Sequence, residues 1–359
     1  MNWVKISDAT ASGKYIFETA EKIKRAGITR SRLVKDGDFL LSNSMSFGRP
    51  YIMRTTGCVH DGWLVLSDYE KHVGQDFLYF LLGSPLVFEQ FDRLAAGSTV
   101  RNLNIELASR VEIPLPPLPE QQRIVGILDE AFDGIATAKA NAEQNLQNAR
   151  ALFESHLQAV FRQRSDGWSE KSLGEVAEVQ SGGTPLVSTK AFWEGDIAWY
   201  SSGELNATFT KNPERHITDQ GLAGSNAKLF PKGSLLVGMY DTAALKMSIL
   251  DRDGAFNQAI AGIKPNDKIE LEFVLHAINA VKPRLLLERR GVRQKNLSLG
   301  KIKEITIPLP SRAEQRAVVA RLLTISSETQ RLESLYQQKL AALEALKKSL
   351  LHQAFTGQL

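Results

Sequence analysis

The sequence lacks the features of an extracellular, membrane-bound or metal-binding protein. It has one cysteine, Cys58, among 359 residues, which excludes a disulfide framework and a thiolate metal cluster. It has no run of about 18 apolar residues that would cross a membrane. Its first ten residues, MNWVKISDAT, lack the basic and apolar regions of a signal peptide. We therefore expect a cytoplasmic protein that does not associate with membranes.

Catalytic motifs are also missing. The sequence contains no G-x-x-x-x-G-K-[ST] loop, no G-x-G-x-x-G after a strand and no H-E-x-x-H, and its six histidines are scattered. The run SGGTP that begins at Ser181 is only superficially similar to a phosphate loop, and we interpret it as a turn. We predict no catalytic and no metal-binding residues. A binding protein is favoured over an enzyme with unrecognised chemistry.

Composition and charge leave several classes of partner open. Apolar content of 43% and charged content of 23% are ordinary for a globular protein, and the length suits about two domains. The net charge of +4 and the pI near 9.0 permit a nucleic-acid partner without establishing one.

The strongest feature of the sequence is a long internal repeat. Residues 97–128 match residues 291–322 at an offset of 194, which aligns the two IPLP runs and the two Glu-Gln pairs that follow them. The offset holds without a gap to Phe161 and Phe355. A repeat of this length indicates two copies of a domain-sized unit.

Each unit is expected to be mixed α+β and rich in strands. In the first unit, residues 37–47 and 61–67 have the short apolar runs of strands. The segment that starts at Phe77 predicts one or two amphipathic helices, broken near Gly83-Ser84-Pro85. The second unit shows the same order, with strands at 233–240 and 254–260 and then a helix from Glu272.

The two units differ at their starts. Trp199 aligns with Trp3, but the second unit has a further segment from Trp168, so the first lacks roughly 30 residues that its counterpart has. A late start codon, a truncated gene or a cloned fragment are all consistent with this difference. The extra segment includes LGEVAEVQSGG, which predicts a strand and a turn. Without it, the first unit is expected to expose a strand edge or to cover that edge with another element.

Each unit ends in prolines and a long helix. The IPLPPLP run cannot be helical, because each proline fixes φ and disfavours the α region in the preceding residue. Helices are predicted over residues 120–161 and 314–355, each about 60 Å long. Ser311 and Glu314 fit a capping box at the start of the second helix.

Both helices carry a heptad seam of apolar positions, typical of helix–helix pairing. The first seam is Leu128, Ala131, Ile135, Ala138, Ala142, Asn145, Ala149 and Leu152. The second seam is Leu322, Ile325, Thr329, Leu332, Tyr336, Lys339, Leu343, Leu346 and Leu350. Small alanines opposite larger leucines favour pairing of the two helices within this chain, and the internal two-fold implied by the repeat predicts an antiparallel pair. Recruitment of another protein by each helix is the alternative. The predicted division is a domain at 1–118, a helix at 119–165, a domain at 166–312 and a helix at 313–359.

Basic and polar residues cluster before the repeated segments and after matching strands. Arg and Lys supply phosphate contacts, Arg can read guanine, and Asn can read adenine, although each side chain can equally be a solvated charge or a turn cap. The candidate DNA-binding residues are Arg49, Arg101, Asn102, Tyr240, Lys246, Arg289, Arg290, Arg293, Lys295 and Asn296.

The sequence resembles the specificity subunits of type I restriction–modification enzymes. The resemblance covers nearly the whole chain and is carried by PLPPLPEQQRIVGILD, PLPSRAEQRAVVARL, W-x₄-LGEVAEVQSGGTP from Trp168 and the ending LLHQAFTGQL. It implies two target recognition domains, each reading half of a bipartite double-stranded DNA site, with the helices as a spacer. The shortened first domain departs from the family pattern.

The resemblance also implies partners and cofactors. Two modification subunits are expected to dock on the helices and to bring S-adenosylmethionine for adenine methylation, in which the base is flipped out of the duplex. Restriction subunits, where present, would add ATP- and Mg-dependent translocation and cleavage. No cofactor is expected in this chain. A coiled-coil scaffold that binds no DNA is the alternative function, and salt-dependent DNA binding distinguishes the two.

Overall fold

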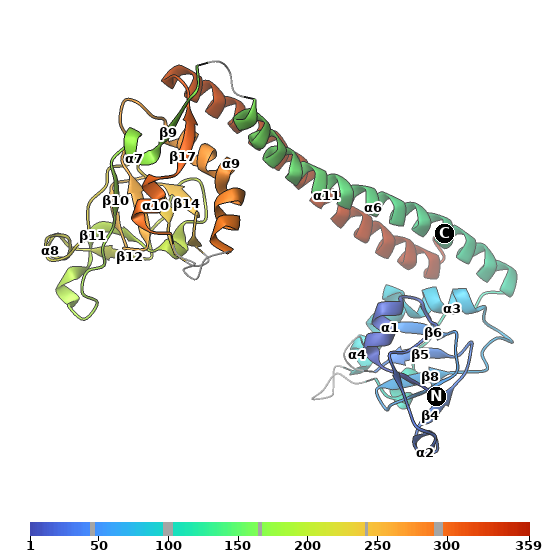
Figure 1. The fold of residues 1–359 in the computed structure, drawn as a ribbon. Helices are drawn as coiled ribbons and strands as arrows, with labels where there is room; N and C mark the ends of the chain where they lie inside the picture. The colour runs from blue at the N-terminus through green and yellow to red at the C-terminus, as the bar shows by residue number, and fades with distance from the viewer. Residues whose placement is uncertain (44–46, 96–102, 164–166, 241–242, 291–296) are drawn as a thin grey trace. The chain divides into compact units, whose positions relative to one another are not determined.

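The computed structural model describes residues 1–43, 47–95, 103–163, 167–240, 243–290 and 297–359, with the side chains of 288–290 excepted. The chain divides into two compact units. Unit 1 is residues 1–146 with 335–359, and unit 2 is residues 147–334. Each unit combines small sheets with short helices and with part of each of two long helices, so the predicted α+β class with long paired helices is confirmed (Figure 1).

The described part of unit 1 contains two four-stranded sheets. The first has the order β3-β1-β7-β4, with a parallel pair at its centre, and the second has the order β2-β6-β5-β8. The strands of the first sheet are β1 (Asn2–Val4), β3 (Glu21–Lys22), β4 (Arg32–Val34) and β7 (Gly57–Val59). Those of the second are β2 (Tyr15–Ile16), β5 (Phe39–Ser42), β6 (Pro50–Met53) and β8 (Trp63–Leu66). The β5 and β8 strands fall where the apolar runs predicted strands, whereas β6 lies between the two predicted runs.

Five short helices complete the described part of unit 1. They are α1 (Ile6–Ser12), α2 (Arg25–Ile28), α3 (Gln75–Leu82), α4 (Pro85–Ala95) and α5 (Ile105–Ala108). The helical segment breaks between α3 and α4, because the helix cannot pass smoothly through Gly83-Ser84-Pro85. The predicted break is therefore confirmed.

Unit 2 repeats this arrangement and adds to it. Its sheets have the orders β10-β16-β13-β14, β12-β11-β15 and β17-β9. The strands are β9 (Ser169–Ser172), β10 (Val179–Ser181), β11 (Trp193–Tyr200), β12 (Arg215–Ile217), β13 (Leu235–Gly238), β14 (Met247–Ile249), β15 (Gly254–Phe256), β16 (Ile260–Ile263) and β17 (Thr306–Leu309). The helices are α7 (Leu173–Val176), α8 (Asp219–Ala223), α9 (Leu271–Arg290), α10 (Leu299–Lys303) and the 3₁₀ turns η1 (Lys190–Phe192) and η2 (Ser202–Glu204).

Strand pairing supports the alignment of Trp3 with Trp199. Trp3 pairs in parallel with Cys58 of β7, and Trp199 pairs in parallel with Ala255 of β15. On the other side, Trp3 lies opposite Glu21 and Trp199 opposite Arg215, both antiparallel. The two units therefore share one strand framework.

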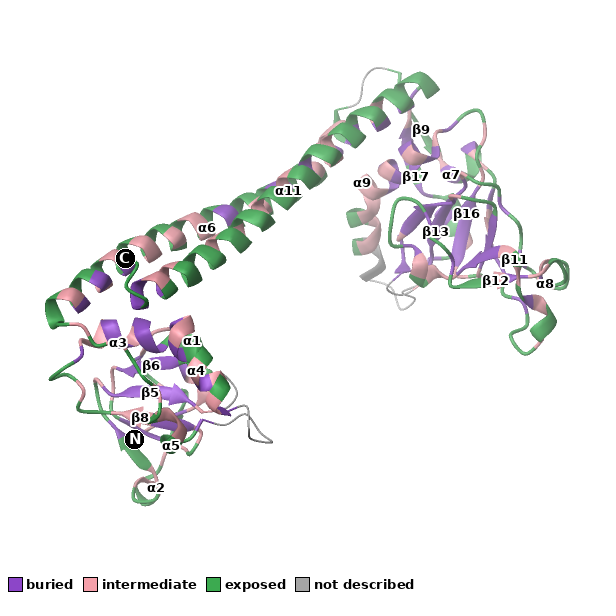
Figure 2. Cartoon of the chain, turned by 180° about the vertical axis from the view of Figure 1, so that it is seen from behind, coloured by how far each residue is buried: buried purple, intermediate pink, exposed green. Residues whose placement is uncertain are grey.

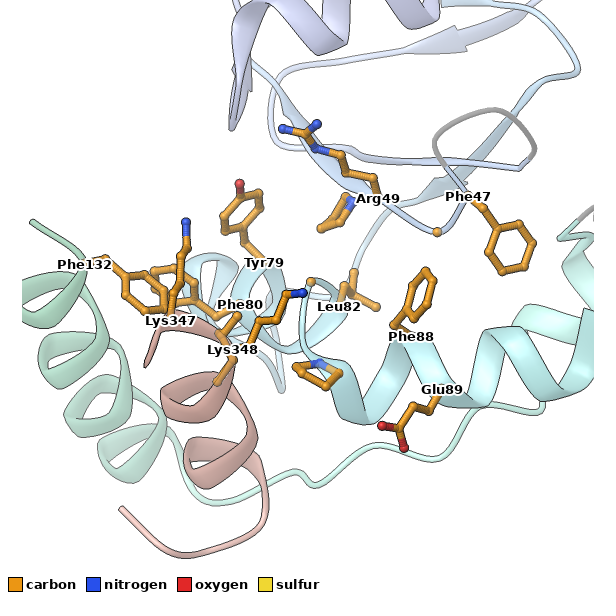
Figure 3. Close-up of a pocket in the computed structure, with 15 residues that line it drawn as sticks. Phe47, Arg49, Tyr79, Phe80, Leu82, Phe88, Glu89, Phe132, Lys347 and Lys348 are labelled. Carbon is orange, nitrogen blue, oxygen red and sulfur yellow. The ribbon is translucent and has the colours of Figure 1, made fainter. Parts of the chain in front are cut away.

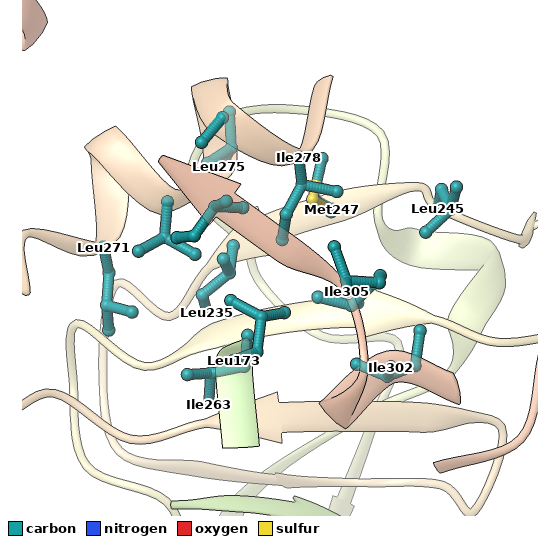
Figure 4. Packing of buried hydrophobic residues seen from close by; sticks show 14 of the residues in the cluster. Leu173, Leu235, Leu245, Met247, Ile263, Leu271, Leu275, Ile278, Ile302 and Ile305 are labelled. Carbon is teal, nitrogen blue, oxygen red and sulfur yellow. The ribbon is translucent and has the colours of Figure 1, made fainter. Parts of the chain in front are cut away.

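Residues 168–181 contribute to the core of unit 2. Leu173, Val176 and Val179 pack in one cluster with β13, β16, α9 and α10 (Figure 4). In the described part of unit 1, β8 is the last strand of its sheet and no strand corresponds to β10. Buried residues follow the strands in both units, whereas the outer faces of the long helices are exposed (Figure 2).

The long helices are α6 (Leu118–Arg162) and α11 (Arg312–Phe355), close to the predicted bounds. Ser311 and Glu314 form the predicted capping box, with Glu314 Oε2 accepting from the Ser311 N–H at 3.1 Å. In unit 1, Phe132 lies under Lys347 and Lys139 pairs with Glu344, so the two helix segments run antiparallel.

Burial along the long helices follows the predicted seam as far as Ala142 and Tyr336 and departs from it at four later positions. Leu128 and Leu322 are fully buried, Ile135, Ile325, Leu332 and Leu343 are half-buried, and Thr329 is buried. Leu152 and Leu346, however, are 50% and 46% exposed, and Asn145 and Lys339 also face solvent. These four assignments to the seam were wrong.

The reason is that the spacing of the buried positions changes from the heptad pattern at the same place in both helices. After Ala142 and Tyr336, Leu146 and Leu340 lie in the seam in place of Asn145 and Lys339. In α6 the seam then continues through Ala149 and Phe153. An α-helix has 3.6 residues per turn, so an extra four-residue step corrects the drift of a strict heptad. Leu146 and Leu340 are 194 residues apart and therefore occupy the same position of the repeat.

Candidate nucleic-acid interface

Arg49 lies at the entrance to β6 in unit 1, after the turn from β5. Its side chain is exposed, and its guanidinium carbon lies 5.3 Å from the ring centroid of Tyr51. A stacked guanidinium of this kind keeps its donors free for a planar or anionic partner.

Arg49 borders an open pocket of about 740 Å³ in unit 1. Lys347 and Lys348 of α11 and Phe132 of α6 line another side of it, with Tyr79 between (Figure 3). The pocket thus combines an aromatic lining with three cationic side chains, against the single carboxylate of Glu89. This composition suits an anionic ligand with flat, apolar parts.

Lys246 lies at the matching place in unit 2, directly before β14. Its Nζ donates a hydrogen bond to Oδ1 of Asn206 at 3.2 Å. It lines an open pocket of about 430 Å³ together with Asn206, Asn279 and Lys282. Burial lowers the pKa of Lys282, and the neighbouring charge of Lys246 lowers it further, whereas Glu154 acts in the opposite direction. The positive charges of Lys246 and Lys282 repel each other, and an anion bound between them would be attracted by both.

The two pockets occupy the same place in the shared framework. Arg49 precedes Pro50, which pairs with Leu41 of β5, and Lys246 precedes Met247, which pairs with Val237 of β13. Helix positions that line them also correspond, because Gly83 and Asn279 lie 196 residues apart, as do Trp3 and Trp199. The structure therefore brings one sequence-predicted cation to an equivalent pocket in each unit.

Tyr240 follows β13 but is not fully available to a ligand. It is half-buried and packs against the main core cluster of unit 2. Its carbonyl accepts a hydrogen bond from the N–H of Ala243 at 3.1 Å. A role for its hydroxyl in DNA contact stays a prediction.

The other candidates are not placed by the structure. Arg101, Asn102, Arg293, Lys295 and Asn296 lie outside the described residues. Arg289 and Arg290 are the last residues of α9, but their side chains are not described. The predicted roles of all seven stay predictions.

Sequence reasoning missed several residues of the two pockets. Asn206, Asn279 and Lys282 come from separate elements, and no motif connects them. Lys347 and Lys348 are adjacent cations in α11, and that doublet was the only local signal for their part in the unit 1 pocket.

Within the described residues, no three or more His, Cys, Asp or Glu side chains gather in a way that could hold a metal ion. None of the described helices is long and apolar enough to cross a lipid bilayer.

Comparison with known proteins identifies the family. Residues 3–148 and 165–344 each match the family described as the type I restriction modification DNA specificity domain. These two matches cover most of the chain, which therefore belongs to this family.

Named relatives agree with that assignment. The chain is 27% identical over 227 residues to the EcoR124I/EcoR124II specificity subunit of Escherichia coli, covering 58% of this chain and 54% of that protein. This alignment thus spans about half of the relative's length. It is 24% identical over 371 residues to the putative MjaX specificity subunit of Methanocaldococcus jannaschii, covering 94% of this chain and 82% of that protein.

Two solved structures share the fold. One, from work on complex assembly and conformational transition of the type I R-M system, superposes with a TM-score of 0.82 at 20% identity, covering 99% of this chain and 91% of the other. The other is the HsdS subunit from Thermoanaerobacter tengcongensis, with a TM-score of 0.72 at 20% identity, covering 99% and 90%.

Proposed function

We propose that this chain is the DNA-recognition subunit of a type I restriction–modification complex and reads a bipartite site. The observation that carries the proposal is the presence of two specificity domains in one chain, each matched separately. The names of the relatives, all specificity subunits, support it.

Each unit contributes a cation from the same place in its framework. Arg49 in unit 1 offers a planar fork of donors for guanine or a phosphate, and Lys246 in unit 2 offers a point charge suited to phosphate. Lys282 lies beside Lys246 and adds a second charge. We assign these side chains to the DNA contact of their half-sites.

The paired helices serve as the spacer between the two readers. Half-site separation then follows from helix length, as it does in dimeric DNA-binding proteins. Removal of one heptad from both helices would change the spacing of the recognised site and leave its two halves unchanged.

The chemistry belongs to partner subunits in this proposal. Two modification subunits dock on the helices, bind S-adenosylmethionine and methylate one adenine in each half-site after base flipping. Restriction subunits, where the system has them, bind ATP and Mg. This chain is non-catalytic and holds no cofactor.

DNA binding tests the proposal directly. A pool of randomised duplexes is selected on the chain in complex with its cognate modification subunit, and affinity is then measured between 50 and 200 mM salt. We expect enrichment of a two-part motif and affinity that falls steeply with salt, by about one power of the salt concentration per phosphate contact. Assembly with the modification subunit but no selected motif would contradict the proposal and favour a scaffold.

A further inference from the structure

Unit 1 has an apolar groove along the edge of β8 that pairs with no other described strand. It has a volume of about 270 Å³ and lies between β8, α5 and the segment that follows α5. Two of its large apolar side chains face solvent, with Ile105 66% exposed and Ile113 37% exposed. The full lining is Leu41, Leu64, Val65, Leu66, Leu78, Leu82, Phe91, Ile105, Ala108, Ser109, Val111 and Ile113.

The matching surface of unit 2 is covered. Val111 and Ile113 correspond to Ile305 and Ile307, 194 residues later. Ile307 is completely buried, whereas Ile113 is 37% exposed. Likewise, β16 is hydrogen-bonded along its outer edge to β10, whereas β8 has only β5 as a neighbour among the described strands.

Residues 173–181 form the cover in unit 2. The N–H of Leu173 donates to the carbonyl of Ile305 at 3.0 Å. Leu173, Val176 and Val179 are buried and belong to the same core cluster as Ile305. Figure 4 shows Leu173 and Ile305 within this cluster. The strand β10 then pairs with β16 from Val179 to Ser181. One turn of helix and one short strand thus fill the groove and complete the sheet.

We propose that the groove of unit 1 binds a strand–turn segment whose sequence resembles that of residues 173–181. Such a segment has apolar residues at the positions of Leu173, Val176 and Val179 and adds its strand to the β8 edge. Strand addition of this kind gains affinity from backbone hydrogen bonds and specificity from alternate side chains in pockets. The groove can accept such a segment because its lining corresponds to the surface of unit 2 that residues 173–181 cover.

A second contact limits what can bind. The side chain of Gln90 donates to the carbonyl of Glu112 at 2.8 Å and accepts from its N–H at 3.0 Å. Glu112 corresponds to Thr306, which pairs with β9 in unit 2. One residue of the backbone that a counterpart of β9 would use is therefore already hydrogen-bonded, and we take the added segment to correspond to α7 and β10.

A labelled peptide tests this proposal on the full chain. A synthetic peptide with the sequence of residues 173–183, labelled with fluorescein, is titrated with the chain and followed by fluorescence anisotropy. We expect a dissociation constant on the order of 10–100 μM, because ordering a flexible peptide offsets much of the gain from burial. A peptide that carries Leu173→Asp and Val176→Asp is expected not to bind.

Variants of the chain assign the site. Ile105→Asp places a carboxylate at the first turn of α5, where it is compatible with the helix, and is expected to weaken binding at least tenfold. Leu229→Asp, a similar change of an exposed leucine in unit 2, is expected to leave binding unchanged. No binding at 1 mM chain, or equal binding by Ile105→Asp, would overturn the proposal. So would a dimer of the chain, seen by sedimentation, that Ile105→Asp dissociates, because it would assign the groove to a second copy.

Discussion

Gln121 and Gln315, 194 residues apart, make the same three hydrogen bonds, each in its own unit. Gln121 Nε2 donates to the carbonyls of His72 at 3.1 Å and Pro116 at 2.8 Å, and its Oε1 accepts from the N–H of Gly74 at 2.8 Å. Gln315 does the same with Lys268 at 3.1 Å, Pro310 at 3.0 Å and Glu270 at 2.8 Å. Both side chains are buried. Each glutamine therefore fixes the start of a long helix to the loop before α3 or α9.

Replacement of Gln121 by leucine should loosen this joint. The change leaves a buried N–H and two carbonyls without their partner, at a cost of about 1–3 kcal/mol in the free energy of unfolding for each unsatisfied group that water does not reach. We expect faster amide hydrogen exchange at residues 72–76 in Gln121→Leu and no change at 268–272. Gln122→Leu, at the exposed neighbouring position, is the matched control. Unchanged exchange at 72–76 would show that the glutamine does not hold the joint.

The long helices are joined by an ion pair in each unit. The repeat aligns the basic residue of each pair with the acidic residue of the other. Lys139 pairs with Glu344 at 2.7 Å in unit 1, and Arg150 pairs with Glu333 at 3.1 Å in unit 2. Lys139 is the repeat counterpart of Glu333, and Arg150 that of Glu344. If α6 instead paired with a second copy of α6 in the same register, Lys139 would face Arg150 and the two positive charges would repel each other. The charges therefore favour pairing of α6 with α11.

Charge reversal tests this pattern. Lys139→Glu should lower the melting temperature by about 1–3 °C, since it opposes Glu344 at an exposed position where such effects are small. The double variant Lys139→Glu with Glu344→Lys should recover most of the loss. Thermal unfolding followed by circular dichroism measures both, and failure of the double variant to recover would exclude a direct interaction.

Removal of the pocket cations should weaken DNA binding. We expect Arg49→Gln and Lys246→Gln each to reduce affinity about 3- to 30-fold and to lower the slope of log affinity against log salt by about one where the contact is a phosphate. Lys22→Gln and Lys228→Gln make the same change of charge at exposed positions outside the two pockets and serve as controls. Equal losses in the variants and their controls would indicate only a general effect of charge.

Glu270 should make unit 2 sensitive to acid. Burial opposes ionisation of this carboxylate, but hydrogen bonds from Arg316 and Arg312, each at 2.7 Å, lower its pKa overall. A folded-state pKa below the unfolded value of about 4.3 means that ionised Glu270 stabilises the folded state above that pH. This contribution is lost as the pH falls through the folded-state pKa.

The variant Glu270→Gln isolates that contribution. At pH 7 it should unfold at lower urea concentration than the unmodified chain, and the difference should shrink below about pH 4 as Glu270 becomes protonated. A difference that stays constant from pH 7 to pH 3 would contradict the assignment. Glu272→Gln, two residues further along α9, is the control.

Local signals predicted much of the fold. The break after Leu82 follows from Gly83 and Pro85, and the capping box at Ser311 and Glu314 is a short-range pattern. The internal repeat predicted two related units, because one alignment fixed the corresponding strands. These features depend on neighbouring residues or on a comparison within the sequence.

The rest depends on contacts between distant residues. Nothing adjacent to Gln121 indicates that its partners are His72 and Gly74, almost fifty residues earlier. At Leu146 the spacing of the buried helix positions departs from the heptad. This departure arises from the geometry of the helix pair and not from a break in apolar content. Lys282 joins Lys246 only because α9 packs beside the turn before β14.

A map of methylated adenines tests the central claim most directly. It is made on DNA from cells that produce this chain with its cognate modification subunit. Recognition by both units predicts a bipartite motif with two different halves at a fixed spacing. A motif in which one half-site is repeated would contradict reading by unit 1, and a stable complex that methylates no defined motif would contradict the DNA-recognition function.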